Sequence, residues 1–486
     1  MTPETPQGLQ GSPDAVRLPT SVPSTTAVTG ATAYVWTIAS IAALGGLLFG
    51  YDWVVIGGAK PFYEAHFKLT SASLIGWVNS CALLGCLLGT ILCGAVSRHL
   101  GRKWLLIFSA LLFAASSVLT GWAHSLHKFV IWRIVGGMAI GIASNVSPIY
   151  IAEVSPPLWR GRLVALNQLA IVIGIFAAQV VNWLIAEPVP TGADAALIRA
   201  SWNGEVGWRW MFTAVALPST VFFVSALFIP ESPRWLITRG KLDRAREILQ
   251  RIGDTSYTGQ VVGDSATEHT GPRPRTIAEL LSRPLLGTLL VGIFLAFLQQ
   301  WCGINVIFYY AEEIYAKAGY DLNAILFNII LTGAVNVGCT ILALRWIDGL
   351  GRRALMLFGC AAISLCHLLL GVFFALNTTG PAVLIVSLFT IGCFAVSLAP
   401  VTWVLIAEMF PNEARGEAVS ISVAALWISC FLATLTFPVM VRGLGASWTF
   451  WIYGLVCLAG FAVVKTCVRE TKGRSLEEIE RDVAGV

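Results

Sequence analysis

The chain has 486 residues, of which 56% are hydrophobic and only 12% are charged, and its mean hydropathy is +0.75. Soluble domains carry roughly a quarter charged residues, so this composition excludes a soluble globular protein. The net charge of +5 comes from short basic clusters between apolar runs rather than from one continuous stripe, which argues against binding to nucleic acid.

The first 33 residues are rich in Pro, Ser, Thr and Gly and carry a single basic residue, Arg17. They lack the basic and apolar blocks of a cleaved signal peptide. We therefore expect residues 1–33 to form a disordered cytoplasmic tail.

From residue 34 onward the chain is a succession of apolar windows, each long enough to cross a bilayer, which takes about 20 residues. Charges and Gly/Pro clusters separate twelve such windows, and these windows do not show the short alternating pattern of membrane β-barrels. Their approximate centres are residues 46, 85, 113, 140, 174, 219, 296, 335, 365, 394, 429 and 457. The sequence thus predicts an all-α membrane protein with twelve transmembrane helices.

One long polar segment, residues 231–283, separates the sixth window from the seventh. Apolar side chains recur in it at helical spacing beside several arginines, which predicts an amphipathic helix. These apolar residues are Leu242, Ala245, Ile248 and Leu249. The predicted organisation is an N-terminal six-helix half (34–230), this cytoplasmic linker (231–283), a C-terminal six-helix half (284–468) and a cytoplasmic tail (469–486).

The distribution of lysine and arginine predicts the orientation of the chain. With the N-terminus in the cytoplasm, 24 of the 32 basic residues face the cytoplasm, seven face outside, and Arg133 lies within the membrane. Cytoplasmic loops of membrane proteins carry an excess of Lys and Arg. Both termini are therefore predicted to be cytoplasmic.

Two motifs of the first half recur in the second half at an offset of about 250 residues. They are Glu153 with Arg160, which returns as Glu408 with Arg415, and Gly101-Arg102, which returns as Gly351-Arg352. Matched motifs at one offset indicate two homologous halves related as parallel repeats. All of these motifs fall on the predicted cytoplasmic side, where arginines can bind carboxylates and helix ends and latch that side closed. Plain topogenic charge is the alternative.

Two ionisable residues stand inside otherwise apolar windows, Asp52 in the first and Arg133 in the fourth. An unpaired ion at bilayer depth is costly, so each is expected to face the interior of the bundle and to find a partner. Each is the best candidate partner of the other. A purely structural ion pair that anchors two helices is the alternative.

The eleven cysteines lie in apolar windows, with no CxxC pairing and no histidine at ligand spacing. They are expected to be small buried side chains. We expect neither a metal site nor a cofactor.

Several motifs together resemble the sugar porters of the major facilitator superfamily, and the resemblance extends over nearly the whole chain. They are Phe49-Gly50-Tyr51-Asp52, Pro230-Glu231-Ser232-Pro233-Arg234-Trp235, Gln299-Gln300-Trp301-Cys302-Gly303-Ile304-Asn305 and Glu470-Thr471-Lys472-Gly473. The resemblance is strongest to the bacterial pentose–proton symporters of that family. It implies a major facilitator fold in a bacterial inner membrane and transport by alternating access, with no covalent chemistry and hence no enzyme activity.

A sugar site must replace the water around the hydroxyls by donors and acceptors, and neutral amides offer both. The resemblance implies that the sugar contacts are Gln168, Gln299, Gln300, Asn305, Asn336, Trp403 and Trp427, with Tyr309 shielding the outer side. A single amide in a span more often bonds a neighbouring helix. The adjacent Gln299 and Gln300, followed by Asn305 in a window interrupted by glycine, favour a binding site.

The chain also departs from the family pattern. Ile175 and Leu426 stand where the pentose–proton symporters carry glutamine, and Ala399 stands where the family often has glycine. A sugar hydroxyl that faced either apolar side chain would lose its partner, at a cost on the order of 1–3 kcal/mol. The substrate is thus left open between a different pentose, a hexose and a deoxy sugar.

The resemblance further implies that Asp52 binds the proton and that Arg133 modulates its pKa. Uniporters of the family have a neutral residue at the aspartate position, so the carboxylate favours proton coupling. We therefore predict a monomeric, proton-coupled symporter that imports a neutral monosaccharide, whose partners are the sugar, the proton and the lipid bilayer. A proton-independent sugar or polyol facilitator is the alternative. A transport-dead sugar sensor is disfavoured, because only about 20 residues follow the last window.

Overall fold

The computed structural model describes residues 29–190, 192–253, 258–259, 283–410, 412–468 and 470. Most of the predicted N-terminal tail, most of the linker after residue 253 and nearly all of the C-terminal tail lie outside these described residues.

The helices form two groups, which we call the first and the second bundle. The first bundle consists of α1 (Thr29–Phe67), α2 (Ala72–Leu100), α3 (Arg102–Gly121), α4 (Leu126–Val154), α5 (Pro157–Ile185), α6 (Ala195–Ala200), the π-helix η1 (Asn203–Gly207), α7 (Trp208–Thr213) and α8 (Ala216–Phe228). The second bundle consists of α13 (Arg283–Trp301), α14 (Ile304–Tyr309), α15 (Ala311–Lys317), α16 (Leu322–Leu350), α17 (Arg352–Ala375), α18 (Pro381–Val396), α19 (Leu398–Glu408), α20 (Asn412–Leu444) and α21 (Ala446–Cys467). The short helices α9 (Pro233–Thr238) and α10 (Leu242–Ile252) lie between them in the chain.

Within the described ranges, twelve helical spans are long and apolar enough to cross a membrane. This confirms the predicted all-α fold with twelve transmembrane helices. Helices are the expected solution, because a bilayer offers no water to the backbone and a helix satisfies its own N–H and C=O groups. The sixth span is built from η1, α7 and α8, the seventh from α13 and α14, and the tenth from α18 and α19.

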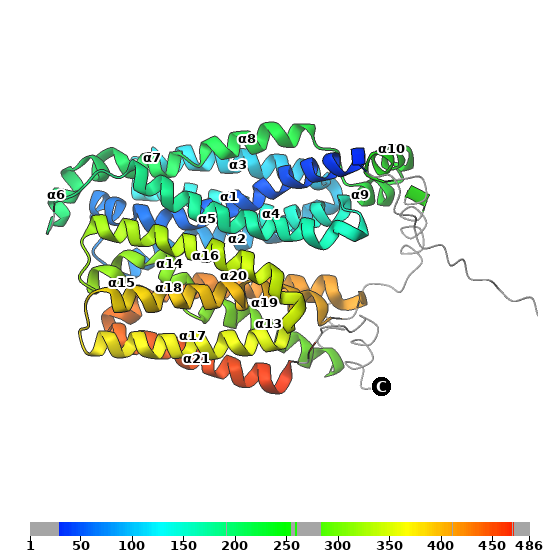
Figure 1. Cartoon of the computed structure of the whole chain (residues 1–486). Helices are drawn as coiled ribbons and strands as arrows, with labels where there is room; N and C mark the ends of the chain where they lie inside the picture. The colour runs from blue at the N-terminus through cyan, green and yellow to red at the C-terminus, as the bar shows by residue number, and fades with distance from the viewer. Residues whose placement is uncertain are drawn as a thin grey trace, which may run out of the picture.

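Each bundle is held together by contacts among its own helices, and the most extensive contacts between the bundles come from two helix pairs. In the first bundle α1 packs against α5, and α4 against both α2 and α3; in the second, α13 packs against α20 and α17 against α21. Between the bundles, α2 packs against α20 and α5 against α16. Figure 1 shows α1 to α8 as one layer above the helices of the second bundle, with α9 and α10 at the end opposite to α6 and α15.

Helices α2 and α4 approach each other closely at glycines. A Cβ added to Gly137 would lie 1.9 Å from the carbonyl oxygen of Ala82, and one added to Gly85 would lie 2.1 Å from that of Ile134. Any side chain at these positions would therefore push the backbones apart. Small residues at helix interfaces are how membrane bundles gain dispersion contacts without a hydrophobic driving force.

The seventh and tenth spans are interrupted inside the membrane. Gly303 separates α13 from α14 with a left-handed φ of 82°, which a residue without Cβ adopts at little cost. In the tenth span the helix stops at Val396, and Ser397 adopts φ −121° and ψ −89° before α19 begins. Pro400 lacks the N–H that would bond the carbonyl of Val396, so the break lies one turn ahead of the proline.

Two carboxylates cap equivalent helices in the two bundles. Glu231 Oε1 accepts hydrogen bonds from the backbone N–H groups of Arg102 (2.8 Å) and Lys103 (3.1 Å) at the start of α3. Glu470 accepts from Arg352 at Oε1 (2.9 Å) and from Arg353 at Oε2 (3.1 Å) at the start of α17. The preceding residues, Gly101 and Gly351, have φ of 87° and 92°. Both caps exploit the unsatisfied N–H groups and the positive dipole of a helix N-terminus.

We expect Glu231→Gln to destabilise the protein by about 1–2 kcal/mol, because a charge-assisted cap becomes a neutral one. The measurement is the apparent thermal unfolding midpoint of the detergent-solubilised protein. Glu247→Gln is the matched control, since Glu247 on α10 is exposed and pairs with exposed Arg251 at 2.7 Å. Equal midpoints for the two variants would show that the cap contributes nothing.

The amphipathic helix predicted in the linker is α10. Ala245, Leu249 and Ile252 are buried on it, whereas Leu242 is exposed. The helix packs against α9 and α1. The buried face of α10 therefore extends to Ile252 and leaves out Leu242, which the sequence pattern placed on the apolar face.

Candidate functional site

Asp52 and Arg133 form an ion pair between α1 and α4. Arg133 Nη1 donates to Asp52 Oδ1 at 3.0 Å, and the two side chains are only 5% and 3% exposed. The structure thus brings together the two ionisable residues that the sequence placed in separate spans.

The pair is incompletely satisfied by protein groups. Asp52 Oδ2 and Arg133 Nε are buried and have no hydrogen-bond partner among the described residues. The guanidinium instead lies over the ring of Phe212 in α7, 5.4 Å from its centre. A cation over an aromatic face is stabilised by the ring quadrupole, so Arg133 keeps one favourable contact that does not depend on Asp52.

The amides of the seventh span form a chain of hydrogen bonds. Gln300 Nε2 donates to Gln299 Oε1 at 3.3 Å, and Asn305 Nδ2 donates to Gln300 Oε1. Gln299 Nε2 in turn donates to the backbone carbonyls of Leu398 (3.3 Å) and Ala399 (3.2 Å) beside the break in the tenth span. The two interrupted spans are thus linked through side chains whose donors and acceptors a ligand can replace.

The same chain of amides reaches the eleventh span. Asn305 Nδ2 lies 3.5 Å from Cys430 Sγ in α20. Cys430 is one helical turn after Leu426 and Trp427, and all three are buried. The α20 residues predicted for the site therefore share one region of the bundle with the amides of α13 and α14.

Aromatic side chains of both bundles meet beside these amides. The Trp427 ring lies 5.9 Å from that of Phe49, and the Trp53 ring lies 5.3 Å from that of Tyr309, an edge-on contact. The indole N–H of Trp427 is buried and lacks a partner among the described residues. Phe49 and Trp53 belong to α1, so α1 carries the aromatic contacts with the second bundle as well as Asp52.

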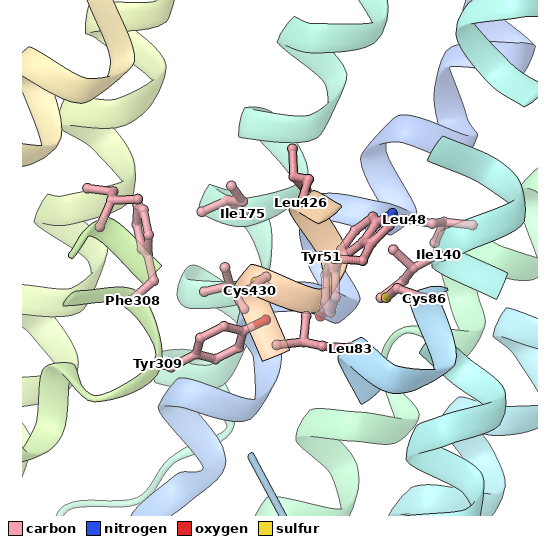
Figure 2. Close-up of a cluster of buried hydrophobic side chains, with 14 of the residues drawn as sticks. Leu48, Tyr51, Leu83, Cys86, Ile140, Ile175, Phe308, Tyr309, Leu426 and Cys430 are labelled. Atoms are coloured by element: carbon pink, nitrogen blue, oxygen red, sulfur yellow. The ribbon is translucent and has the colours of Figure 1, made fainter. Parts of the chain in front are cut away.

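The apolar replacements Ile175 and Leu426 lie in a buried hydrophobic cluster. Figure 2 shows both of them in one close-up with Tyr51, Tyr309 and Cys430. Neither offers a hydrogen bond, so these two side chains can contact only apolar groups of a ligand.

Three further predicted contacts lie on other helices, α5, α16 and α19. Gln168 in α5 is half-buried, and Asn336 in α16 is buried. Trp403 in α19 is 38% exposed, in contrast to the buried Trp427. Among the described residues, no hydrogen bond joins any of these three to the amide chain.

Sequence reasoning missed Gln179. This buried amide in α5 donates from Nε2 to Thr332 Oγ1 in α16 at 3.2 Å and so joins the two bundles, while its Oε1 lacks a partner in the described structure. The signal was available, because positions 168, 175 and 179 recur at intervals of seven and four on one face of a helix.

Sequence reasoning also missed His367. Its Nε2 lies 2.7 Å from the carbonyl oxygen of Cys302, which the break at Gly303 releases from helical hydrogen bonding. The ring is fully buried and stacks on Phe450. No signal in the sequence around His367 could have revealed this, because its partner is 65 residues away in another helix.

The predicted latch residues pair within each bundle. Arg102 Nη2 lies 3.0 Å from Glu153 Oε1, and Arg352 Nη2 lies 3.7 Å from Glu408 Oε1. Arg160 instead donates to the backbone carbonyl of Ser155 at 3.5 Å. The side chain of Arg415 lies outside the described residues.

The family model for the sugar (and other) transporter family matches residues 38–483. The chain is 35% identical over 481 residues to the D-xylose-proton symporter of Escherichia coli strain K12, covering 92% of this chain and 95% of that protein. It is 35% identical over 449 residues to the arabinose-proton symporter of Bacillus subtilis, with the same coverage of 92% and 95%. Among solved structures it is similar to the xylose transporter from E. coli in a partially occluded inward-open conformation, with a TM-score of 0.80 and 34% identity over 91% of this chain and 100% of that one.

Proposed function

The chain belongs to the sugar transporter family, and from this premise we propose that it is a proton-coupled symporter that imports a neutral monosaccharide by alternating access. The observation that carries the proposal is the buried ion pair of Asp52 and Arg133. A titratable carboxylate at bilayer depth is expensive to maintain, and such groups mark proton relays in transporters. Proton–sugar symporters among the relatives support the same assignment.

The proposed sugar site lies between the two bundles near the interrupted seventh span. Gln299, Gln300 and Asn305 would exchange hydrogen bonds with sugar hydroxyls, and Trp427 would supply an aromatic face and an N–H donor. Gln168, Asn336, Trp403 and Tyr309 complete the set that we propose from the family resemblance. Binding between repeats at the bilayer midplane is what alternating access requires.

We propose the same topology that the charge distribution predicts. The multi-pass protein would lie in the bacterial plasma membrane as a monomer, with both termini and the linker of residues 231–283 in the cytoplasm. The halves would be residues 34–230 and 284–468. The latch pairs Arg102–Glu153 and Arg352–Glu408 would then lie on the cytoplasmic side, with Arg160 and Arg415 beside them.

Uptake by proteoliposomes tests the function. A panel of radiolabelled pentoses, hexoses and deoxy sugars is offered with and without an inward pH gradient. At least one sugar should accumulate above its external concentration, and a protonophore should abolish the accumulation. Uptake that merely equilibrates, whatever the gradient, would identify a facilitator instead.

Leu426→Gln is expected to change the order of sugar preference. The added amide would offer a partner to a hydroxyl that now faces an apolar wall, which is worth on the order of 1–3 kcal/mol for the sugar that presents one. The measurement is a competition series against one labelled sugar. Leu426→Met is the matched control, because it keeps an apolar side chain of similar volume. An identical ranking in native protein and both variants would show that Leu426 does not line the site.

A further inference from the structure

Lys60, one of the seven basic residues that the charge distribution places outside, is buried between the bundles. Lys60 belongs to α1, and its side chain is only 1% exposed. Its Nζ lies 3.2 Å from Glu64 on the same helix, 3.3 Å from Glu312 and 2.8 Å from Glu313, both on α15 of the second bundle. We call these four residues the outer cluster.

The outer cluster lies at the end of the molecule opposite to α9 and α10, where α15 is seen in Figure 1. Two further contacts join the bundles at loops of this end. Asn323 at the start of α16 exchanges two hydrogen bonds with the backbone of Val189, and Arg442 in the last turn of α20 donates to the carbonyl of Thr70. Close backbone packing accompanies them, since a Cβ on Gly57 in α1 would lie 2.5 Å from the carbonyl oxygen of Phe308. This end is closed in the structure.

The charges of the outer cluster do not balance. One ammonium faces three carboxylates, and any two carboxylate oxygens that bind the same nitrogen at hydrogen-bond distance lie within roughly 6 Å of each other. The side chains of Glu64, Glu312 and Glu313 are 16%, 23% and 31% exposed, and like charges at that separation in a partly buried site disfavour full ionisation. Glu313 Oε2 is buried and lacks a hydrogen-bond partner in the described structure, so it can carry a proton.

The other groups around the cluster do not supply the missing positive charge. Tyr63 of α1 donates its hydroxyl to Asn79, and the Tyr310 ring lies 5.5 Å from Lys60 Nζ. Lys317 of α15 lowers the pKa of Glu313 less than Lys60 does. Burial raises the pKa of Glu313, against the opposing effect of Lys60.

We propose that the outer cluster is a second proton-binding site, which takes up one proton when the two bundles close at this end and releases it when they open. The proposal rests on the proposed alternating access, because only then do Lys60 and α15 separate and the carboxylates return to water. The proton is shared by the cluster and belongs to no single carboxylate. It enters and leaves on the same side, so the site biases the gate and is not part of the transported stoichiometry.

The sign of the effect follows from linkage. A state that binds a proton more tightly gains population as the pH falls and loses it as the pH rises. The closed outer gate should thus be favoured at low external pH, and the ratio of closed to open forms should fall by up to about tenfold per pH unit where the cluster titrates. External acid would then drive the loaded carrier toward the inward-facing state.

The test measures the gate rather than transport. Spin labels are placed at Ser73 in α2 and Leu376 after α17, both exposed, with Cys467 replaced by serine because it is the one exposed cysteine in the described part of the chain. The distance distribution is recorded between pH 5 and pH 8. An Asp52→Asn background removes the contribution of that carboxylate, so the result does not depend on whether Asp52 couples transport.

We expect the short, closed distance to lose population as the pH rises, and Glu64→Gln or Glu313→Gln to flatten this dependence because the neutral amide stands in for the protonated acid. Lys60→Met should open the gate at pH 8. Glu205→Gln, an exposed outer carboxylate, is the matched control and should keep the native slope. The proposal is overturned if the native distribution does not change with pH, or if both glutamine variants keep the native slope. A failure of proton-coupled uptake with the pH slope intact would overturn the proposed function alone.

Discussion

Gln300→Ala is expected to weaken sugar binding ten- to a hundred-fold while the protein still folds. Gln300 is the middle member of the amide chain, donating to Gln299 and accepting from Asn305. Without Gln300, a ligand hydroxyl loses a hydrogen-bond partner, and Asn305 Nδ2 loses the amide oxygen to which it donates. The expected cost in binding free energy is on the order of 1–3 kcal/mol for a desolvated group.

Equilibrium binding by the purified protein, followed by tryptophan fluorescence or calorimetry, measures this loss. The matched control is Asn79→Ala. It removes a buried amide of α2 that accepts a hydrogen bond from the Tyr63 hydroxyl and donates one to the carbonyl of Ile75. The control should lower stability and leave sugar affinity within about twofold of native. If the two variants bind sugar equally well, the amides of the seventh span are structural and the site lies elsewhere.

The twelve spans were predictable because hydropathy is a local property of the chain. The break at Gly303 was predictable for the same reason, since a glycine within an apolar window interrupts the pattern visibly. The exact break in the tenth span was not predicted. The helix stops at Val396, four residues before Pro400, since the group that the proline cannot satisfy is the carbonyl four residues earlier.

The pairing of distant residues was predictable only where chemistry left one choice. Asp52 and Arg133 were the two ionisable side chains deep in separate spans, so the ion pair followed from the cost of leaving either alone. Lys60 shows the limit. Its neighbour Glu64 is four residues on, but Glu312 and Glu313 come from a helix about 250 residues later, and nothing local indicates that the lysine is buried between them.

Glu231 and Glu470 show a second limit. The sequence marked both motifs as characteristic of the family but gave neither glutamate a partner. The structure shows these two glutamates bound to backbone N–H groups of α3 and α17. Backbone donors carry no sequence signal, so an N-terminal cap supplied from 118 or 129 residues away is visible only in three dimensions.

Asp52→Asn is expected to abolish uphill sugar uptake while sugar-for-sugar counterflow continues. One positive charge that crosses the membrane gains about 2.3 kcal/mol per 100 mV, which corresponds to roughly fifty-fold accumulation at about 1.36 kcal/mol per factor of ten. That gain is available only if the loaded carrier must be protonated before it reorients. The asparagine imitates the protonated acid permanently, so the carrier reorients without a proton and the gradient no longer drives it.

The ion pair supplies the physical reason. Protonation of Asp52 removes the charge that holds Arg133 at 3.0 Å and so loosens α1 from α4, while the Phe212 ring still accommodates the guanidinium. Accumulation and counterflow are measured in the same proteoliposomes, with Asp243→Asn on the exposed face of α10 as the control that should retain both. If Asp52→Asn still concentrates sugar in response to a pH gradient, another residue couples the proton, and the buried pair of α1 and α4 is a structural anchor.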